Sequence, residues 1–423
     1  MLRGIGDLSC FENRRGTVGY RDFVSHGKHI EWYNSSTSMA RESAIEDKLR
    51  QESDIYRRFY EENNGPTVVM NGRRILMFGS VNYLCMTHHP RIIEVTVDAI
   101  RRFGAGAVGS RFSNGSLTVH RDLDDILADF MGKDAALVFN SGYMANLGVI
   151  SAGIGPDAII FSDKENHLSI FDGCKLSGAK VFRYKHNDME HLETFLKRHD
   201  KHKDKWIVAV GTFGVSGETI RIREIVGLAE KYGAHIYLDD AHEIGLMGSN
   251  LRGLAEENGV LDQIDLIMAS FQMAFGNVGA FVCGKRKVIE TLRVSARPYI
   301  FSYGLPVPST FALIETCKIL RSKEGATLVN RLWRNVDRLR ETLKRHQLIP
   351  SSSDSQIVSA LIADEMRTIT MSQKLLEQDV WAQTYLHPAV PPGRAALRFT
   401  CMASHQSGDF VHLDNALRNL GSS

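Results

Sequence analysis

An acidic residue and a histidine lie close together in the segment LDDAHEIG, residues 238–245. Asp239 ends an apolar run that is typical of a buried strand, and His242 follows three residues later. A carboxylate buried at the end of a strand needs a partner, and the protonated ring nitrogen of a bound ligand would supply one. Two other interpretations stay open, a simple turn and a metal site. The sequence offers no third ligand with typical metal-site spacing, so we expect no metal.

A glycine follows another apolar run in the segment NSGYMAN, residues 140–146. A strand that passes through Ser-Gly into a helix exposes backbone N–H groups at the start of the helix, where the helix dipole favours an anion. Gly142 and Tyr143 are therefore candidates for holding a phosphate group. A glycine in this position can also be a plain turn.

Two further side chains have the chemistry to contact a flat ring or a carboxylate. His167, in FSDKENHLSIFDG, lies just past a predicted strand end and could stack on a cofactor ring, or it could be an ordinary loop histidine. Arg398, in ALRFT, could clamp a carboxylate through two parallel hydrogen bonds. An isolated arginine is more commonly solvated or part of a structural ion pair.

Most of these residues fall at the ends of strands in a repeating α/β pattern. From about residue 90, short apolar runs alternate with helical segments, which predicts a mostly parallel sheet with helices on both faces. Because strand C-terminal ends gather at one edge of such a sheet, we expect a common crevice there. The polar or small residues at these ends are Asn140–Gly142, Ser162–Asp163, Gly211–Thr212, Asp239–Asp240 and Ala269–Ser270.

The N-terminal region has a different pattern. Residues 1 to about 40 are polar and aperiodic and indicate a surface arm. The Asn71-Gly72 pair between TVVM and RRILMF predicts a β-hairpin with a type I′ turn, because both central residues of that turn need positive φ. A helix is predicted before the hairpin, ending at ENNG, from the spacing of Ile45, Leu49, Ile55 and Phe59.

The C-terminal region predicts a smaller α+β lobe. A long helical stretch runs from about residue 309 to 347 and leads into the loop SSSDSQ. The apolar run IVSALIAD, a helical segment around MSQKLLEQ and the run ALRFTCMAS follow it.

The composition excludes several classes of protein. A chain of 423 residues that is 43% hydrophobic can bury a large core, and its net charge of +2 gives no dominant field for nucleic acid or an anionic membrane. No apolar run reaches membrane-spanning length, and the first residues lack a signal-peptide core. The six cysteines are scattered without a CxxC pair, which fits a reducing compartment. We therefore expect a cytoplasmic protein.

Seven segments, in order and context, resemble one enzyme family, the α-oxoamine synthases, over roughly residues 75 to 410. That family includes 8-amino-7-oxononanoate synthase, 2-amino-3-ketobutyrate CoA ligase, 5-aminolevulinate synthase and serine palmitoyltransferase. The resemblance implies the aspartate aminotransferase-like fold type I of transferases that depend on pyridoxal 5′-phosphate (PLP). It also implies a homodimer, and decarboxylative condensation of an amino acid with an acyl thioester on CoA or a carrier protein. The segments are GAGAVGSRFSNGSLTVHRDLDDILADFMG, NSGYMAN, DKENHLSIFDG, KHNDMEHLE, LDDAHEIGLMGSNLRG, ARPYIFSYGLP and HPAVPPGRAALRFTCMASH.

With this resemblance we expect four parts in the chain. Residues 1–66 would form the N-terminal arm and helix, and residues 67–94 the hairpin segment of the small lobe. Residues 95–305 would form the large PLP-binding domain with a mixed, mostly parallel sheet. Residues 306–423 would form the C-terminal α+β domain.

The family pattern, carried onto this sequence, assigns most contacts to the cofactor and the substrate. His167 would stack on the pyridine ring, Asp239 would face the ring nitrogen, and His242 would lie near the phenolic oxygen. A carboxylate at Asp239 would keep the ring nitrogen protonated, which makes the cofactor an electron sink. The other assignments are Gly142 and Tyr143 for the phosphate and ring edge, Ser270 in place of a threonine for the phosphate, Ser302 for a phosphate contact from the neighbouring subunit, Arg398 for the substrate carboxylate and Asn82 for a further substrate contact.

One departure from the family affects the reaction itself. The family's GTFSKxxGxxGG is ASFQMAFGNVGA here, residues 269–280, which puts Met273 where the Schiff-base lysine belongs. That lysine also moves the proton on and off the substrate Cα, and a thioether can do neither. Lys285 and Lys287 belong to a following segment and do not take its role. We therefore expect any PLP to be held without a covalent bond.

Other positions near the site have also changed. Val210 replaces a usual glutamate, Gly214 a usual serine near the phenolic oxygen, and Ser216 a usual aspartate. SVNYL, which contains Asn82, replaces the common SNDYL. Several changes around one site favour natural divergence over a single engineered substitution.

Three interpretations of function follow. The first is an α-oxoamine synthase-type acyltransferase whose site is altered or disabled by Met273. The second is a catalytically silent partner of a lysine-bearing homologue, like the lysine-lacking subunit of eukaryotic serine palmitoyltransferase. The third is a lysine-free enzyme that uses an aminated cofactor for dehydration or deoxygenation. Because silent subunits tend to lose their cofactor contacts, retention of Asp239, His242 and His167 favours the first.

Overall fold

The computed structural model describes residues 55–56, 58–348, 354–387 and 389–420. The fold described below is that of Phe59–Ser423. The predicted N-terminal arm lies outside the described residues, as do the first positions of the predicted helix.

The predicted helix does not extend to Phe59, so this part of the prediction is wrong. Phe59 is not helical and is 86% exposed. The backbone N–H of Glu61 donates to Val69 O at 2.8 Å, and the short strand β1 (Glu62–Asn63) pairs with the hairpin instead. Pairing with an available strand edge therefore replaces the predicted helix end.

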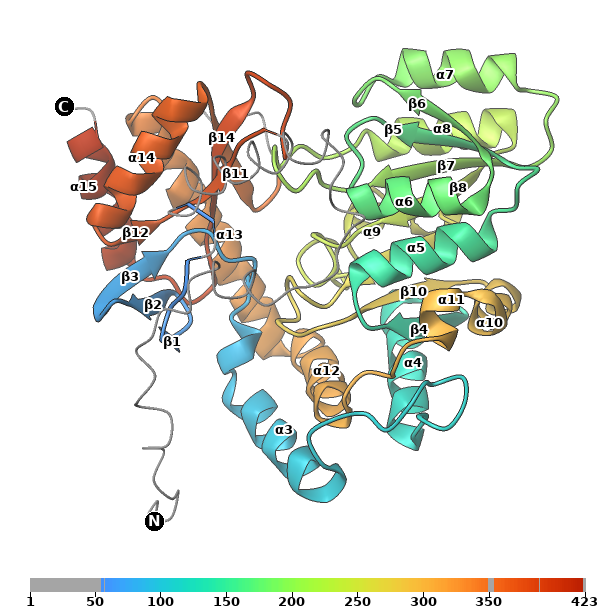
Figure 1. The fold of residues 1–423 in the computed structure, drawn as a ribbon, viewed down its shortest axis with the longest axis horizontal. Helices are drawn as coiled ribbons and strands as arrows, with labels where there is room; N and C mark the ends of the chain where they lie inside the picture. The colour runs from blue at the N-terminus through green and yellow to red at the C-terminus, as the bar shows by residue number, and fades with distance from the viewer. Residues whose placement is uncertain (1–54, 57, 349–353, 388, 421–423) are drawn as a thin grey trace, which may run out of the picture. The chain divides into compact units, whose positions relative to one another are not determined.

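A four-stranded sheet contains the hairpin, which the structure confirms. β2 (Thr67–Met70) and β3 (Arg73–Met77) are antiparallel, and Asn71 and Gly72 both have positive φ, 51° and 71°. The order is β1-β2-β3-β12, and β12 (Val380–Trp381) is parallel to β3. The hairpin is thus joined through β12 to the C-terminal part of the chain (Figure 1).

The largest sheet has seven strands and is mixed but mostly parallel, as predicted. Only β10 runs antiparallel to its neighbours within this sheet. β4, β5, β9 and β10 are buried along their whole length, as expected for strands covered on both faces. The strands in spatial order are β4 (Ala135–Phe139), β10 (Ala280–Gly284), β9 (Leu266–Ser270), β8 (His235–Asp239), β7 (Lys205–Val210), β5 (Ile159–Asp163) and β6 (Lys180–Tyr184).

Helices alternate with these strands along the chain, in the green to yellow part of Figure 1. α5 packs across β9 and β10 and against α6. A side chain at Gly173 of α6 would place its Cβ 2.9 Å from Asn146 O, so glycine permits the close approach of α6 to α5. The helices are α4 (Thr118–Met131), α5 (Gly142–Gly153), α6 (Leu168–Ser177), α7 (Met189–Arg198), α8 (Ile222–Tyr232), α9 (Leu254–Glu257), α10 (Arg286–Ser295) and α11 (Arg297–Ile300).

The long helical stretch predicted for residues 309–347 is two helices. α12 (Val307–Leu320) ends before Ser322, and α13 (Lys323–Arg345) begins after it. The Ser322 side chain accepts from the N–H groups of Glu324 and Gly325, which is an N-cap that starts a new helix. α3 (Pro90–Phe103) packs beside α12.

The C-terminal part is built on a three-stranded antiparallel sheet in the order β11-β14-β13. α14 packs against all three strands and against α15. No helix among the described residues is long and apolar enough to cross a membrane. The remaining elements are β11 (Ile357–Ala363), α14 (Glu365–Glu377), β13 (Gln383–Tyr385), β14 (Ala395–Thr400) and α15 (Ser407–Leu420).

Candidate functional site

The start of α5 lies beside the end of β9. A Cβ built on Gly142 would lie 3.7 Å from Ser270 Cβ and 3.8 Å from Ser270 Oγ. The Ser141 side chain caps α5 by accepting from Met144 N at 3.2 Å. The first N–H groups of a helix have no partner inside it, so those of Gly142 and Tyr143 are available next to the Ser270 hydroxyl. This arrangement suits an anion such as a phosphate.

Asp239 is buried at the end of β8 and is 4% exposed. Its Oδ2 accepts from Asn146 Nδ2 at 2.8 Å, and its Oδ1 accepts from Ala241 N at 3.2 Å. Burial raises the pKa of Asp239, and the Asn146 hydrogen bond partly opposes that rise. Within the described residues no ion pair involves Asp239. The site therefore suits a cationic nitrogen.

Asn146 connects Asp239 to His167. Its Nδ2 also donates to Ser169 Oγ at 2.9 Å, and its Oδ1 accepts from Tyr237 Oη at 2.6 Å. Ser169 Oγ lies 2.7 Å from His167 Nδ1, and Ser169 N donates to the same nitrogen at 3.3 Å. His167 Nδ1 therefore acts as an acceptor, and the exposed imidazole ring is fixed in orientation at the start of α6.

Asn146 and Ser169 were not singled out from the sequence. Both carried a local signal, because Asn146 lies one helical turn after Gly142 and Ser169 lies two residues after the capping His167. What the sequence could not supply was the approach of α6 to α5 that brings the two side chains together.

His242 is enclosed by segments that are far apart in the sequence. Its Nδ1 lies 3.0 Å from Tyr83 Oη, and its carbonyl accepts from Gln356 Nε2 at 2.7 Å. A Cβ built on Gly214 would lie 3.2 Å from His242 Nε2. Burial lowers the pKa of His242 to about 3, with further lowering by the charge of Arg398. The imidazole is therefore neutral at ordinary pH.

Arg398 reaches the same region from β14. Its Nη1 donates to Gly214 O at 2.7 Å, and its guanidinium lies over the Tyr385 ring at 5.0 Å from the centroid. Its Nε is buried and has no hydrogen-bond partner within the described residues. This guanidinium retains donor capacity beside His242.

The turn that contains Gly214 is held by the C-terminal sheet. Ser359 Oγ donates to Val215 O, and Ser355 Oγ donates to Gly217 O at 2.7 Å. Together with Arg398, these contacts fix the turn between the two parts of the fold. Gly214 contacts Arg398 through its backbone carbonyl.

Met273 lies in the turn between β9 and β10 and is partly buried against the core. The turn is closed by Phe271 N, which donates to Gly279 O at 2.9 Å. Gly276 has φ 60°, and a Cβ there would lie 2.9 Å from Asn82 Oδ1. The turn that carries Met273 is therefore pressed against the segment that carries Asn82.

The Asn82 side chain donates from its Nδ2 to Thr87 Oγ1 at 2.7 Å. Its Oδ1 is buried and lacks a partner in the described part of the chain. Ser302 is less closely connected to the other candidates. Its hydroxyl donates to Pro298 O, and the structure gives it no contact with Gly142 or Ser270.

Lys285 and Lys287 lie at the opposite edge of the sheet from Met273. β10 is antiparallel to β9, so Ala280 pairs with Ser270 whereas Gly284 pairs with Leu266. A strand of this length spans about 16 Å. Both lysines follow the far end of β10 and are separated from the Met273 turn by the whole strand.

A buried pair of carboxyl groups lies under the site and was not singled out from the sequence. A Cβ built on Gly211 would lie 2.8 Å from both Asp240 Oδ1 and Glu243 Oε1. Asp240 accepts from Leu254 N at 3.0 Å, whereas neither oxygen of Glu243 makes a well-formed hydrogen bond within the described residues. Burial raises the pKa of both carboxyl groups, and their mutual proximity adds to the rise at Asp240.

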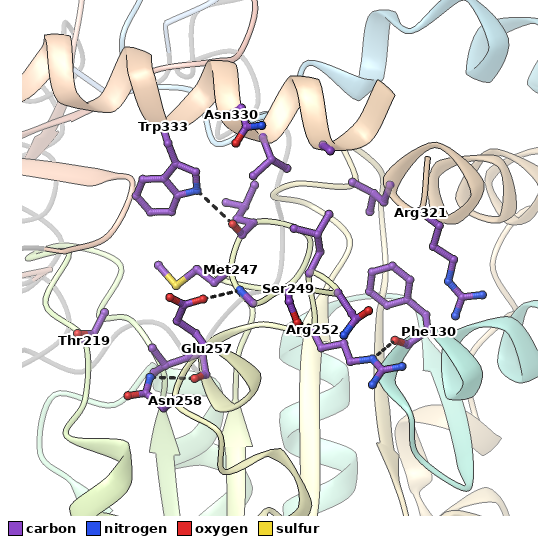
Figure 2. A pocket seen from close by; sticks show the side chains of 18 of the residues that line it. Phe130, Thr219, Met247, Ser249, Arg252, Glu257, Asn258, Arg321, Asn330 and Trp333 are labelled. Atoms are coloured by element: carbon purple, nitrogen blue, oxygen red, sulfur yellow. Dashed lines mark hydrogen bonds between the residues drawn. The ribbon is translucent and has the colours of Figure 1, made fainter. Parts of the chain in front are cut away.

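A separate cavity of about 960 Å³ lies between the loop at residues 246–252, α9 and α13 (Figure 2). The Trp333 indole donates to Leu246 O at 3.1 Å on one side, and Arg252 Nε donates to Phe130 O at 2.7 Å on the other. None of the residues predicted to bind a cofactor or substrate lines this cavity. The strand-end cluster, not this cavity, contains the candidate chemistry.

Comparisons with known proteins agree on one family. The family model described as aminotransferase class I and II matches residues 73–417. A serine palmitoyltransferase of Bacteriovorax stolpii is 38% identical over 365 residues, which cover 85% of this chain and 86% of that protein. An 8-amino-7-oxononanoate synthase of Thermoanaerobacter pseudethanolicus is 38% identical over 379 residues, which cover 88% of this chain and 95% of that protein.

Solved structures give the same result. A lysine-to-alanine variant of serine palmitoyltransferase from S. paucimobilis, with PLP and myriocin bound, matches with a TM-score of 0.87 at 31% identity. The match covers 91% of this chain and 98% of that structure. The predicted fold type I of PLP-dependent transferases is thereby confirmed. The chain belongs to the α-oxoamine synthases, within the aminotransferase class I and II family of PLP-dependent enzymes.

Proposed function

We propose that this chain binds PLP without a covalent bond, in a site of the α-oxoamine synthase type that condenses an amino acid with an acyl thioester and releases CO2. The observation that carries the proposal is the Asp239–Asn146–Ser169–His167 network. Its four side chains come from β8, α5 and the start of α6, and they are joined by hydrogen bonds of 2.7 to 2.9 Å.

The residues fit PLP at three points. The unpaired, buried Asp239 would hold the protonated ring nitrogen, and the oriented His167 ring would cover one face. The free N–H groups at the start of α5, with the Ser270 hydroxyl, would hold the phosphate. When bound, PLP supplies an electron sink for carbanion chemistry at the amino acid Cα. The S. paucimobilis serine palmitoyltransferase variant holds PLP although one of its lysines is an alanine.

The substrate side of the proposal rests on Arg398. Its buried Nε lacks a partner, so a carboxylate can be bound without breaking the hydrogen bond from Nη1 to Gly214 O. Asn82 Oδ1 also lacks a partner, and Thr87 fixes the amide orientation. We infer that these two residues hold an amino acid substrate. The Arg398 guanidinium would orient the substrate through its carboxylate, which every amino acid carries, so this contact does not specify which amino acid binds.

Met273 separates binding from proton transfer in this proposal. A thioether has no proton to exchange, so the step at the substrate Cα falls to another group and is slow. Lysine at the same position would add a base in the turn beside Asn82. We therefore expect Met273→Lys to raise the rate of CO2 release from an amino acid in the presence of an acyl-CoA.

The test measures the binding and covalent attachment of PLP in one arm and the release of CO2 in the other. PLP binding to the dialysed protein is followed by visible circular dichroism, and treatment with borohydride is followed by mass spectrometry of the intact chain. Wild-type protein should bind PLP reversibly and gain no borohydride-stable mass, whereas Met273→Lys should gain it. Met366→Lys, which places a lysine on the exposed surface of α14, is the matched control.

Two results would overturn the proposal. One is failure of both wild-type protein and Met273→Lys to bind PLP. The other is a Met273→Lys variant that binds PLP but shows no change of its visible spectrum and no release of CO2 when any of a set of small amino acids is added.

A second candidate function follows from Met273 itself. The chain would then be a silent subunit that completes the site of a lysine-bearing homologue, whereas under the first proposal it would act as a homodimer. Co-expression with such a homologue separates the two. Activity that neither chain shows alone, retained when Asp239 of this chain is changed to Asn, would support the silent-subunit proposal.

A further inference from the structure

Tyr83 has a buried hydroxyl that contacts the site only through another residue. The side chain is fully buried, and its Oη lies 3.0 Å from His242 Nδ1. Its backbone is also fixed, because Tyr83 O accepts from Ala403 N at 2.7 Å. Since it is enclosed on all sides, Tyr83 cannot itself touch a bound ligand, so any effect on chemistry passes through His242.

The direction of this hydrogen bond follows from the protonation of the two groups. Burial raises the pKa of Tyr83 above its ordinary value, and nearby Arg398 and a Gln356 hydrogen bond oppose the rise only in part, so the phenol keeps its proton. The His242 imidazole is neutral and has one N–H and one lone pair.

Gln356 holds the backbone of His242, because its Nε2 donates to His242 O at 2.7 Å. Within the described residues, His242 Nδ1 is the hydrogen-bond partner of Tyr83 Oη. A buried hydroxyl that points at no acceptor would cost free energy, so Tyr83 donates its hydrogen to His242 Nδ1. The His242 proton is then on Nε2.

The Nε2 side of His242 faces the Gly214 turn. Any side chain at position 214 would begin 3.2 Å from Nε2, and glycine leaves this space open. The Gly214 carbonyl is held by Arg398, so the space is bounded by an N–H donor and a guanidinium. An oxygen anion is the ligand group that such a pair favours.

We propose that Tyr83 is a positioning residue, whose hydroxyl holds His242 in the tautomer that donates from Nε2 to the phenolic oxygen of PLP. The identity of the ligand oxygen rests on the proposed function, whereas the tautomer does not. In a site without a lysine cation, the hydrogen bond donated by His242 Nε2 would stabilise the negative charge on the phenolic oxygen and lower its pKa.

The first experiment measures the tautomer in the protein without cofactor. The chain is labelled with 15N in its histidine rings, and the two ring nitrogens of His242 are assigned by their loss in His242→Gln. Wild-type protein should show a protonated Nε2 and an unprotonated Nδ1 at neutral pH. Tyr83→Phe, which removes only the hydroxyl, should shift both nitrogens towards the average of the two tautomers.

The matched control is Tyr184→Phe. Tyr184 is also buried, but its hydroxyl has no hydrogen-bond partner within the described residues. This variant should leave the His242 signals unchanged. An unchanged tautomer in Tyr83→Phe, with the fold intact by circular dichroism, would overturn the inference.

The second experiment uses bound PLP as the probe. Tyr83→Phe should weaken PLP binding by about 5-fold, the effect of one hydrogen bond, and should shift the pH dependence of the visible absorption band. Tyr184→Phe should do neither. Gln356→Leu should shift the band in the same direction as Tyr83→Phe but by less.

The two experiments separate this inference from the proposed function. If the His242 tautomer depends on Tyr83 but no variant binds PLP, the inference about Tyr83 holds and the proposed function fails. If wild-type protein binds PLP but Tyr83→Phe changes neither the tautomer nor the pH dependence, the function survives and the inference is wrong.

Discussion

Two regions of the candidate site differ in the number of side chains that can donate or accept hydrogen bonds. Around Asp239, side chains from three elements form a continuous hydrogen-bonded network that ends at the exposed ring of His167. In the turn between β9 and β10, the backbone is closed by good hydrogen bonds, but Met273 offers no proton donor or acceptor of comparable strength. The residues suited to hold a ring and the turn that carries Met273 are thus on separate segments. One set can be retained while the other is lost, and the following predictions test this separation.

The largest expected effect is at the Asp239 end. Asp239→Asn keeps the shape but removes the charge that would pair with a ring nitrogen, so PLP affinity should fall by about 100-fold. Equilibrium dialysis measures the dissociation constant. Asp122→Asn, on the exposed side of α4, is the control and should bind like wild-type protein. Equal PLP affinity in wild-type protein and Asp239→Asn would mean that the Asp239 region does not hold the cofactor and does not differ from the Met273 turn in this respect.

Arg398→Lys should have the next largest effect, and on a different ligand. Lysine keeps a charge but cannot reproduce the planar, paired donors of the guanidinium. We expect amino acid binding to the PLP-loaded protein to weaken by about 10- to 30-fold, with a smaller change in PLP affinity. Titrations of each ligand by visible circular dichroism give both constants. A loss of PLP affinity larger than the loss of amino acid affinity would place Arg398 with the cofactor contacts instead.

Glu243→Gln should change how stability depends on pH. The folded protein raises the pKa of this carboxyl, so the unfolded chain gives up its proton first as pH rises above about 4.3. The stability that the protonated group contributes is therefore present at low pH and is lost as pH rises through the raised value. Glutamine cannot ionise, so the variant should gain about 1–2 kcal/mol over wild type at about pH 8 and little at about pH 5.

Urea denaturation at the two pH values measures this difference. Glu256→Gln, which removes a carboxylate that accepts from Asn250 Nδ2 at 2.7 Å, serves as a comparison because it makes the same chemical change outside the buried pair. An equal gain at both pH values would mean that Glu243 does not bind an extra proton in the folded state.

The smallest expected effect is at Met273. Met273→Leu keeps the apolar packing and changes PLP affinity by less than about 2-fold, because the side chain only lines the partly buried turn. The unfolding midpoint should move little. A large loss of PLP affinity would mean that the Met273 sulfur itself contacts the cofactor. The Met273 turn would then belong to the cofactor-binding region together with the Asp239 network.

Local signals were sufficient for much of the fold. The hairpin at Asn71-Gly72 was predictable because its turn chemistry lies in two adjacent residues. The strand that ends at Asp239 was predictable because a buried parallel strand is a continuous apolar run. The long C-terminal helix was predicted without its break, although Ser322 followed by Glu324 is an N-cap pattern, because apolar spacing continues across the break.

The candidate site was only half predictable for a different reason. Asp239, His167 and Arg398 lie at strand ends or in family motifs, whereas Tyr83 and Gln356 meet His242 from segments 159 and 114 residues away. Nothing in the spacing of one segment specifies such a contact. Asn146 and Ser169 are intermediate, since each lies in a motif but acquires its role through the close packing of α6 on α5 at Gly173.

The antiparallel direction of β10 limits where a lysine could serve the proposed site. Residues after the strand emerge at the opposite edge of the sheet, so neither Lys285 nor Lys287 lies beside the turn that carries Met273. Under the proposed function, a covalent attachment of PLP to the wild-type protein would therefore have to be traced to a lysine outside this segment.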